Sequence, residues 1–456
     1  MTAFIFVALV TAFAVAALLR PATAFAAIIC LYGIQQWSAA NDPFFSNQLI
    51  INVSVALIVG SALGVKLLRR ENPLRHYPTV AWLSFALYGY AFLTVFWTVA
   101  PANLLENFSA IAPRTLVILV LVPLLVTKTS DVRDAVHAAI AFGFVVLLLL
   151  WFNTRLREGP GALELQSAAS GRVYGNYLEL GSLAGRVGLL ALFTQVGRWR
   201  RTALVGRVLV LGFAIMVLVM STARGQMGAF VLAAAAVIPL NFRLRRMGIA
   251  GVAIAALLFV LAGQWAYDTL SGLKRFDIDV MQRNVAADRI DTSLTLLQTW
   301  WEGDSATVFF GLGNSAAYKI LGTYPHFTAL EVLGEEGLVG ATLFATIIVS
   351  TVRSFWRGYR LVRDDDGRRA QTCALFSLFI FDVITSSKQG SLLGDSIMFT
   401  FAILASRYVL LVQADGSHAS DLASGRPPTA AVGGLRLAAS DAARQAVTRV
   451  DRPQVD

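Results

Sequence analysis

Long apolar stretches separated by short polar ones recur along this chain of 456 residues. A run of about 20 apolar residues is long enough to cross the hydrocarbon core of a bilayer as a helix. The pattern predicts an all-α, polytopic membrane protein with about 12 spans (12–13), since the first two stretches are short and one of them could be re-entrant. The candidate stretches are residues 2–19, 22–39, 48–66, 78–99, 109–127, 134–152, 175–196, 208–222, 225–240, 248–267, 326–350, 370–386 and 392–412.

Composition supports this interpretation and narrows the function classes. Hydrophobic residues make up 56% of the chain and charged residues only 14%, against about 25% charged in soluble domains. The net charge of +10 does not indicate nucleic-acid binding, because the basic residues cluster in short loops between apolar runs. Both cysteines, Cys30 and Cys373, lie inside apolar runs, so we expect buried thiols rather than a disulfide or a metal site.

The distribution of Lys and Arg predicts which loops face the cytoplasm. Residues 66–76 and 353–369 are strongly basic, whereas residues 41–47 and 100–107 contain no basic residue. Basic loops stay in the cytoplasm, so the alternating loops face outward. We therefore expect four parts: a helical bundle with short loops (1–267), a periplasmic loop (268–325), C-terminal membrane helices (326–412) and a disordered cytoplasmic tail (413–456).

The periplasmic loop is too long for a simple connection, and long loops of this kind are usually functional. Its segment 288–301 places Ile290, Leu294, Leu297 and Trp301 at helical spacing. This pattern predicts an amphipathic helix that lies on the outer membrane interface or packs on the bundle. A glycine turn at 309–314 then precedes the return to the membrane.

Several arginines are expected on the outer side, where the positive-inside rule disfavours them. Arg224 lies at the junction of two helices, Arg186 lies inside an apolar run, and Arg283 and Arg289 lie in the periplasmic loop. Arginines that snorkel to lipid headgroups are the simpler explanation. Their convergence would instead build a site for phosphate oxygens, which guanidinium groups bind in bidentate fashion.

His326 follows the periplasmic loop and opens the next membrane stretch. An imidazole titrates near neutral pH, so it is suited to take a proton from an attacking hydroxyl. A lone histidine is more often structural, but this one shares its side of the membrane with the arginines. Glu331 and Glu335, farther along the same stretch, could orient the imidazole or balance an arginine, and structural ion pairs are equally compatible.

The chain has no Walker A sequence, no dinucleotide-binding fingerprint and no acidic cluster of the kind that holds a catalytic cation. An enzyme of this composition would therefore draw its energy from an activated donor held in the membrane. A sugar on a polyprenyl pyrophosphate fits, because the pyrophosphate is a good leaving group that arginines could neutralise in place of a metal. No cofactor and no metal are expected.

Three segments resemble motifs of the bacterial O-antigen ligase and O-antigen polymerase group of integral membrane glycosyltransferases. "STARGQMGAFVLAAAA" resembles the Ser-Arg-Gly turn and alanine-rich helix, "DRIDTSLTLLQTWWEGDSATVFFGLGN" the arginine-led periplasmic helix, and "PHFTALEVLGEEGLVG" the histidine-led helix. The resemblance implies that Arg224 and Arg289 bind the donor pyrophosphate, that Arg186 does so without a motif of its own, and that His326 is catalytic. The chain departs from the pattern at Ala223, at Phe327 and in the late position of its Trp pair.

The resemblance implies an O-antigen ligase in the bacterial inner membrane with a periplasmic active site. It would transfer O-antigen polysaccharide from undecaprenyl pyrophosphate to the lipid A–core oligosaccharide, without a metal and with inversion. An O-antigen or exopolysaccharide polymerase, or a protein O-oligosaccharyltransferase, would use the same chemistry on another acceptor. A transporter of lipid-linked sugars is the alternative outside the enzymes. Membrane lipids, and not nucleic acid, are the other expected partners.

Overall fold

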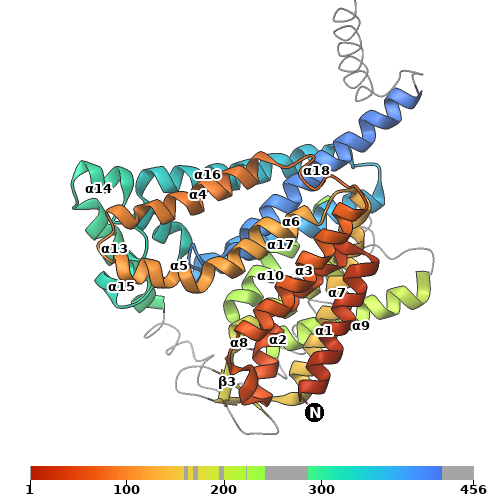
Figure 1. Ribbon diagram of the computed structural model, residues 1–456, viewed down its shortest axis with the longest axis horizontal. Coiled ribbons are helices and arrows are strands. Elements are labelled where there is room, and N and C mark those ends of the chain that lie inside the picture. The colour runs from red at the N-terminus through yellow and green to blue at the C-terminus, as the bar shows by residue number, and fades with distance from the viewer. Residues whose placement is uncertain are drawn as a thin grey trace, which may run out of the picture.

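A computed structural model describes residues 2–158, 163–167, 173–194, 200–221, 223–241 and 286–423. Helices dominate this part of the chain, and together they form an elongated bundle (Figure 1). The helices of the first half are α1 (Thr2–Leu19), α2 (Phe25–Asn41), α3 (Leu49–Leu68), α4 (Thr79–Leu93), α5 (Pro101–Thr115), α6 (Val122–Leu124), α7 (Thr129–Asn153), α8 (Tyr177–Phe193), α9 (Arg200–Met220) and α10 (Arg224–Val237). Those of the second half are α13 (Ala286–Trp301), α14 (Ser305–Phe310), α15 (Ala316–Leu321), α16 (Thr328–Leu361), α17 (Asp366–Gln389) and α18 (Ser396–Ala423).

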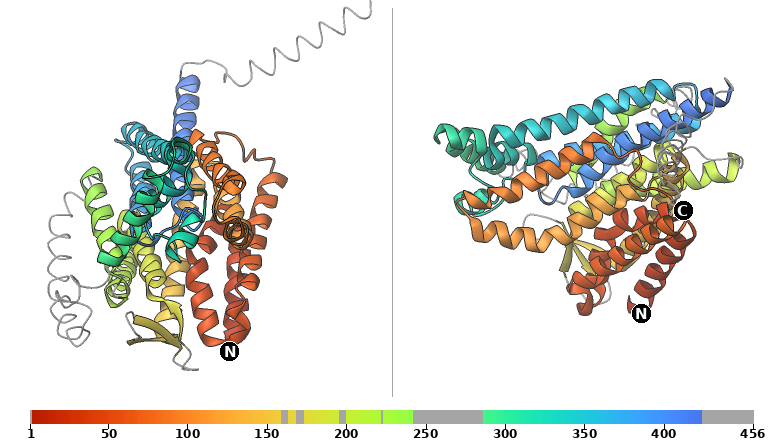
Figure 2. Two further views of the ribbon diagram at one scale, coloured as in Figure 1. Left: turned by 90° about the vertical axis from the view of Figure 1, so that its left-hand side faces the viewer. Right: turned by 45° about the horizontal axis from the view of Figure 1, so that its top comes forward.

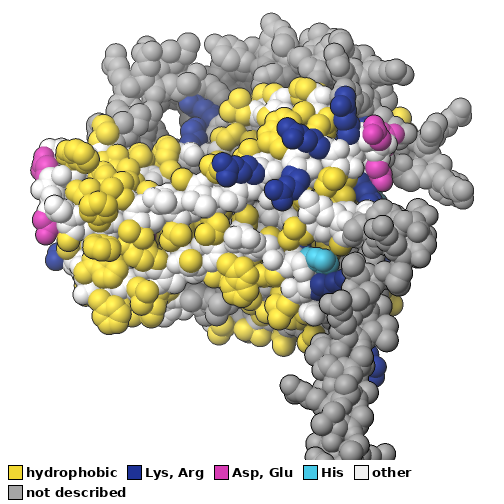
Figure 3. Space-filling model, turned by 90° about the horizontal axis from the view of Figure 1, so that it is seen from above, with side chains coloured by type: hydrophobic (Ala, Val, Ile, Leu, Met, Phe, Trp, Pro, Cys, Tyr) yellow, Lys and Arg dark blue, Asp and Glu magenta, His cyan; other side chains and the backbone are white. Residues whose placement is uncertain are grey.

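The length and apolarity of these helices identify a multi-pass membrane protein. Within the described residues, seven helices are long and apolar enough to cross a bilayer: α1, α3, α4 with its following turn, α7, α16, α17 and α18. Large apolar side chains point away from the bundle, such as Leu57, Leu209 and Leu232, each more than half exposed. Hydrophobic side chains cover much of the face in Figure 3, and most of the Lys and Arg visible there lie toward its right-hand half.

The predicted apolar stretches correspond to helices wherever the structure describes them. Stretches 2–19 and 22–39 are two separate helices, α1 and α2, joined by a short 3-10 turn at Pro21–Ala24. The predicted span at 248–267 lies outside the described residues, so the expected total of 12 or 13 remains a prediction. Cys30 and Cys373 are both free and buried, as expected.

Three features differ from the sequence-based expectation. The segment after α7 forms a small antiparallel sheet of β1 (Thr154–Glu158), β2 (Leu163–Ser167) and β3 (Val173–Asn176), at the edge of the bundle in Figure 2. The alternation of leucine with polar residues in this segment favours strands, so this small sheet is an exception to the otherwise helical structure that the sequence predicts. Helix α18 also continues to Ala423, into the segment expected to be a disordered tail. Asp415 accepts hydrogen bonds from Thr129 and Arg368, which tie this extension to its neighbours.

The third difference concerns the buried face of α13. The spacing predicted an apolar face that includes Leu294 and Trp301, but these side chains are 54% and 70% exposed. Leu296 and Trp300 are buried instead, because Gly334 of α16 leaves room for Leu296 to pack against the backbone. The helix therefore packs on the bundle through one stripe and presents a second apolar stripe outward.

Helices α13, α14 and α15 gather at one end of the bundle, beyond the ends of α4, α5 and α16 (Figures 1 and 2). A break in α16 holds them there. Gly337 has φ 66° and ψ −164°, a conformation essentially restricted to glycine. The break leaves the carbonyls of Gly334 and Glu335 without helical partners, and the amides of Leu312 and Gly313 donate to them at 3.0 and 2.8 Å.

The backbone approach at this break leaves no space for a side chain. A methyl group on Gly337 would come within 2.4 Å of the Gly311 nitrogen. We predict that Gly337→Ala lowers the free energy of unfolding by about 1–3 kcal/mol or more. Thermal unfolding in detergent would measure this, with Gly60→Ala in α3 as the control because a methyl group there meets nothing within 4 Å. Equal melting temperatures for the two variants would contradict this account of the break.

The sidedness of the bundle gives a second prediction. Ser305 lies exposed in the group of α13, α14 and α15, and Asp364 lies exposed in the basic loop between α16 and α17. In a background without Cys30 and Cys373, Ser305→Cys should react with a membrane-impermeant maleimide in intact spheroplasts, and Asp364→Cys should react only after permeabilisation. The reverse pattern would place the α13–α15 end in the cytoplasm.

Candidate functional site

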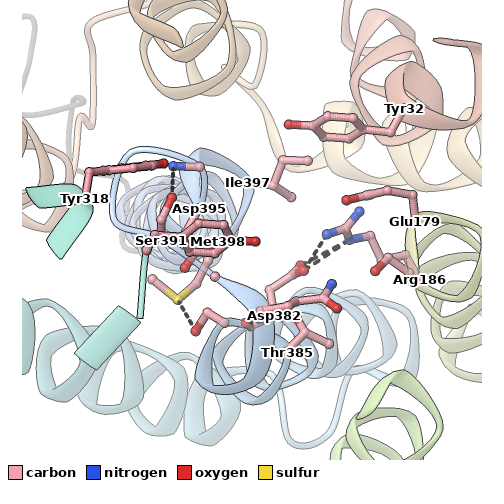
Figure 4. Close-up of a pocket in the computed structure, with 16 residues that line it drawn as sticks. Tyr32, Glu179, Arg186, Tyr318, Asp382, Thr385, Ser391, Asp395, Ile397 and Met398 are labelled. Carbon is pink, nitrogen blue, oxygen red and sulfur yellow. Dashed lines mark hydrogen bonds and ion pairs between the residues drawn. The ribbon is translucent and has the colours of Figure 1, made fainter. Parts of the chain in front are cut away.

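A polar cavity of about 300 Å³ lies beneath α15, where α2, α8, α17 and α18 meet (Figure 4). Three tyrosines, three carboxyl side chains, one arginine and several hydroxyl and amide groups line it. The lining residues are Tyr32, Glu179, Ser182, Arg186, Tyr318, Tyr324, Asp382, Thr385, Ser386, Gln389, Gly390, Ser391, Gly394, Asp395, Ile397 and Met398. A polar cavity inside an apolar bundle is a candidate functional site, because ionisable groups are costly at membrane depth.

Arg186 lies in the wall of this cavity and pairs with a carboxylate from another helix. Its Nη2 lies 2.6 Å from Oδ1 of Asp382 on α17, and its Nε lies 3.2 Å from the same oxygen. Helices α8 and α17 approach closely because Gly185 leaves room for the ring of Phe381. Both charges are buried, so each depends on the other for compensation.

Arg224 is the first residue of α10 and is not among the residues that line the cavity. The turn before it packs on α8, where a methyl group at Gly181 would come within 2.7 Å of Cβ of Ala223. Two residues after Arg224, Gln226 donates a hydrogen bond of 2.8 Å to Gln389, which lines the cavity. The structure therefore brings the helix start that carries Arg224 next to the cavity wall.

His326 lies in the turn before α16, two residues ahead of the first helical residue, Thr328. The sequence predicts that the membrane stretch begins at His326, and the helix begins two residues after this histidine. Its φ of 59° is unusual for a residue with a side chain, and such conformations cluster at functional sites. The imidazole packs against Tyr324 with ring centroids 4.0 Å apart, and Tyr324 lines the cavity.

Asp395 connects the start of α16 to the cavity. Thr328 donates a short hydrogen bond to its carboxylate, and a methyl group on Gly390 would collide with both partners. Burial raises the pKa of the Asp395 carboxyl to about 7, against the opposing effect of the Thr328 hydrogen bond. Because Thr328 lies two residues after His326, this hydrogen bond places the carboxyl beside the segment that carries the histidine.

The glutamates that follow His326 organise the turns around it. Glu335 accepts hydrogen bonds of 2.8 Å from the amides of Ser315 and Ala317, at the start of α15. Glu336 accepts a hydrogen bond of 2.8 Å from the side-chain amide of Asn314. These carboxylates thereby fix the turn that places α15, and with it Tyr318, over the cavity.

Glu331 performs a similar task at the turn between α17 and α18. Its carboxylate accepts a hydrogen bond of 3.2 Å from the amide of Leu392, whose carbonyl accepts one of 2.8 Å from Tyr88. A direct role of Glu331 or Glu335 in orienting the imidazole stays a prediction.

The two remaining predicted site residues, Arg283 and Arg289, belong to the segment predicted to be the periplasmic loop. Arg283 and the side chain of Arg289 lie outside the described residues. The backbone of Arg289 belongs to α13, one turn before Ser293. Ser293 donates a hydrogen bond of 3.1 Å to the carbonyl of Pro325, the residue before His326. Helix α13 is thus anchored to the histidine segment.

The sequence interpretation missed several residues of the cavity wall, among them Glu179, Asp382 and Asp395. A signal for two of them was present. Asp382 and Asp395 are carboxyls inside the predicted apolar stretches 370–386 and 392–412, where an ionisable residue indicates function. The pairing of Asp382 with Arg186 depends on the packing of α8 on α17, which no local pattern reveals.

Comparisons with known proteins agree with the resemblance in part. No protein-family model matches the chain. The chain is 24% identical over 405 residues to the exopolysaccharide production protein ExoQ of Rhizobium meliloti (strain 1021), covering 80% of this chain and 86% of that protein. A structure described as "Structural coordination of polymerization and crosslinking by a peptidoglycan synthase complex" covers 74% of this chain and 97% of its own, at 14% identity and a TM-score of 0.41. That structural likeness is too low to support a conclusion.

The buried pair generates a prediction about stability. Arg186→Met leaves Asp382 buried without its cation, so we expect a loss of about 3–5 kcal/mol in the free energy of unfolding. Arg20→Met is the matched control, because it breaks a pair with Asp134 in which the arginine is 67% exposed, and a loss below about 1 kcal/mol is expected there. Unfolding in detergent measures both. Equal losses would show that the buried Asp382 carboxylate does not need the charge of Arg186 for its stability.

Proposed function

We propose that this protein is a membrane glycosyltransferase that moves a saccharide from a polyprenyl pyrophosphate to an acceptor hydroxyl. One observation carries the proposal: Arg186 lies in the wall of a polar cavity inside an apolar bundle, His326 packs against Tyr324 of the same wall, and the helix that begins at Arg224 is hydrogen-bonded to Gln389 there. Such an arrangement suits a substrate with a lipid part, an anionic part and a sugar.

The lining of the cavity suits sugar hydroxyls better than a free anion. Three carboxyls and one arginine face the space, and Asp382 already compensates that arginine. Carboxylates, amides and hydroxyls hydrogen-bond to sugars, and tyrosine rings offer apolar faces for the sugar ring. The cations that would neutralise a pyrophosphate are therefore expected outside this lining, and Arg224 at the start of α10 and Arg289 on α13 are the candidates.

The proposed reaction is a single displacement. His326 takes the proton of the acceptor hydroxyl while its oxygen forms a bond to the anomeric carbon of the donor sugar. The bond between that carbon and the phosphate oxygen breaks, and the pyrophosphate leaves with the electron pair. Arginine side chains stabilise the negative charge as it grows, and the imidazolium then returns its proton to water. One displacement inverts the anomeric centre.

The first candidate for the acceptor is the lipid A–core oligosaccharide, which makes the protein an O-antigen ligase at the periplasmic face of the inner membrane. The second candidate is a polymerase that extends another lipid-linked repeat, and the likeness to an exopolysaccharide production protein is compatible with both candidates. The two candidates share the donor and the chemistry, and they differ in the acceptor alone. Supplying purified lipid-linked saccharide with rough lipopolysaccharide, or with a second lipid-linked repeat, in EDTA and without nucleotide, separates them by product.

The base assignment gives the prediction for this subsection. His326→Ala should lower single-turnover transfer about 10²–10⁴-fold, because a base acts on the hydroxyl in the transition state. Donor affinity should change little. His76→Ala is the matched control, since His76 also has a positive φ, of 58°, but lies in the basic loop between α3 and α4. Transfer by His326→Ala at the rate of the control would reject the base assignment and make Asp395 the next candidate.

A further inference from the structure

Arg114 is a cation deep in the bundle that no motif assigns. It lies one residue before the end of α5, and its guanidinium carbon lies 5.1 Å from the centroid of the Tyr32 ring, which lines the polar cavity. Its Nε is buried and has no hydrogen-bond partner among the described residues. Arg186 differs, because its guanidinium is bound by Asp382. Arg114 therefore retains a buried donor that an incoming anion could satisfy.

A second cavity, this one apolar, adjoins the position of Arg114. It has a volume of about 290 Å³ and lies between α4, α5 and the π-helical segment Leu116–Leu121 that follows α5. Its lining residues are Phe85, Tyr88, Gly89, Phe108, Ile111, Thr115, Leu119, Val120 and Leu393. A π-helical turn widens the helix and is found mostly at functional sites.

At two places, residues that are neighbours in the sequence lie next to the two different cavities. Leu393 lines the apolar cavity and the next residue, Gly394, lines the polar one. Thr115 lines the apolar cavity, and Arg114 directly before it lies over Tyr32 of the polar one. Arg114 lines neither cavity itself, but it contacts Tyr32 of the polar cavity and directly precedes Thr115 of the apolar one, so it lies between residues that line the two spaces.

We propose that Arg114 binds the lipid-proximal phosphate of a polyprenyl pyrophosphate, whose first isoprene units lie in the apolar cavity and whose sugar enters the polar one. This inference rests on the proposed function and adds to it a phosphate-binding residue and a place for the tail. A phosphate oxygen would give the buried Nε its missing acceptor, through a charge-assisted hydrogen bond. The adjoining apolar cavity argues for a phosphate that carries a lipid rather than for free phosphate.

The test measures binding of three probes to the full-length protein in detergent: farnesyl pyrophosphate, inorganic pyrophosphate and farnesol. We expect the wild type to bind farnesyl pyrophosphate most tightly, because that probe alone combines an isoprenoid tail for the apolar cavity with a phosphate for Arg114. Arg114→Met should weaken this binding roughly tenfold to hundredfold, the value of hydrogen bonds to a charged group. Arg114→Lys should weaken this binding less, since the ammonium group keeps the positive charge but cannot form the bidentate hydrogen bonds of a guanidinium.

Arg407→Lys is the matched control. Arg407 also lies over a tyrosine ring, 5.4 Å from the centroid of Tyr77, but its guanidinium donates to backbone carbonyls that include Pro123, away from both cavities. Its substitution should lower the melting temperature without changing the affinity for farnesyl pyrophosphate. A loss of affinity equal to that of Arg114→Lys would overturn the assignment, because the effect would then not be specific to the arginine beside the two cavities.

Gly89→Leu tests the tail separately and does not depend on the folding of the Arg114 variants. A side chain added at Gly89 meets nothing within 4 Å at its first carbon, so leucine should fill the apolar cavity rather than disturb it. It should weaken binding of farnesyl pyrophosphate and leave that of inorganic pyrophosphate unchanged. Unchanged binding by both Arg114→Met and Gly89→Leu, with transfer activity present in the wild type, would overturn this inference alone. A wild type that binds no lipid pyrophosphate would overturn the proposed function as well.

Discussion

The break of α16 at Gly337 is the constraint on which the outer end of the molecule depends. Peptide groups in an apolar surrounding must all find partners, and a helix meets this demand only while it continues. At the break, the freed carbonyls of Gly334 and Glu335 take the amides of Leu312 and Gly313 instead. The side chain of Glu335 then holds the start of α15. One glycine conformation thus docks a whole turn onto the bundle and closes the polar cavity from above with Tyr318.

The cavity below this turn combines compensated and uncompensated charge. Arg186 and Asp382 neutralise each other and join α8 to α17, so they add polarity without adding net charge. Burial raises the pKa of the Asp395 carboxyl, which accepts a hydrogen bond from Thr328. The buried Nε of Arg114 has no hydrogen-bond partner among the described residues. This division assigns sugar recognition to the carboxyls and phosphate recognition to arginines at the edges.

Hydropathy predicted the helices well because burial in lipid demands long apolar runs, and these are visible locally. It failed where a segment is amphipathic. Helix α5 begins at Pro101, earlier than the apolar stretch 109–127, because its first turns carry polar residues. The buried face of α13 was also misjudged, since two apolar stripes compete there and the choice depends on Gly334 of another helix.

Motif resemblance selected Arg186, which lines the polar cavity, and His326, which packs against Tyr324 of its lining, together with Arg224 at the start of α10; their chemical roles stay predictions. It could not reveal that Glu335 accepts hydrogen bonds from backbone amides at the start of α15, the helix before its own. Arg114 was visible as a charge within an apolar stretch and was passed over. Its meaning emerges only from the ring of Tyr32 and the two cavities on either side, which are products of tertiary packing.

The central claim is that the polar cavity beneath α15 receives the sugar of a lipid-linked donor next to His326. A cryo-electron microscopy structure of the His326→Ala variant with a saccharide-bearing polyprenyl pyrophosphate tests it most directly, because the variant should hold the donor without transfer. The account predicts density for the sugar between Tyr324 and Asp395, with the anomeric carbon facing position 326. Donor density at the opposite end of the bundle, or a cavity that stays empty while the donor binds elsewhere, would contradict it.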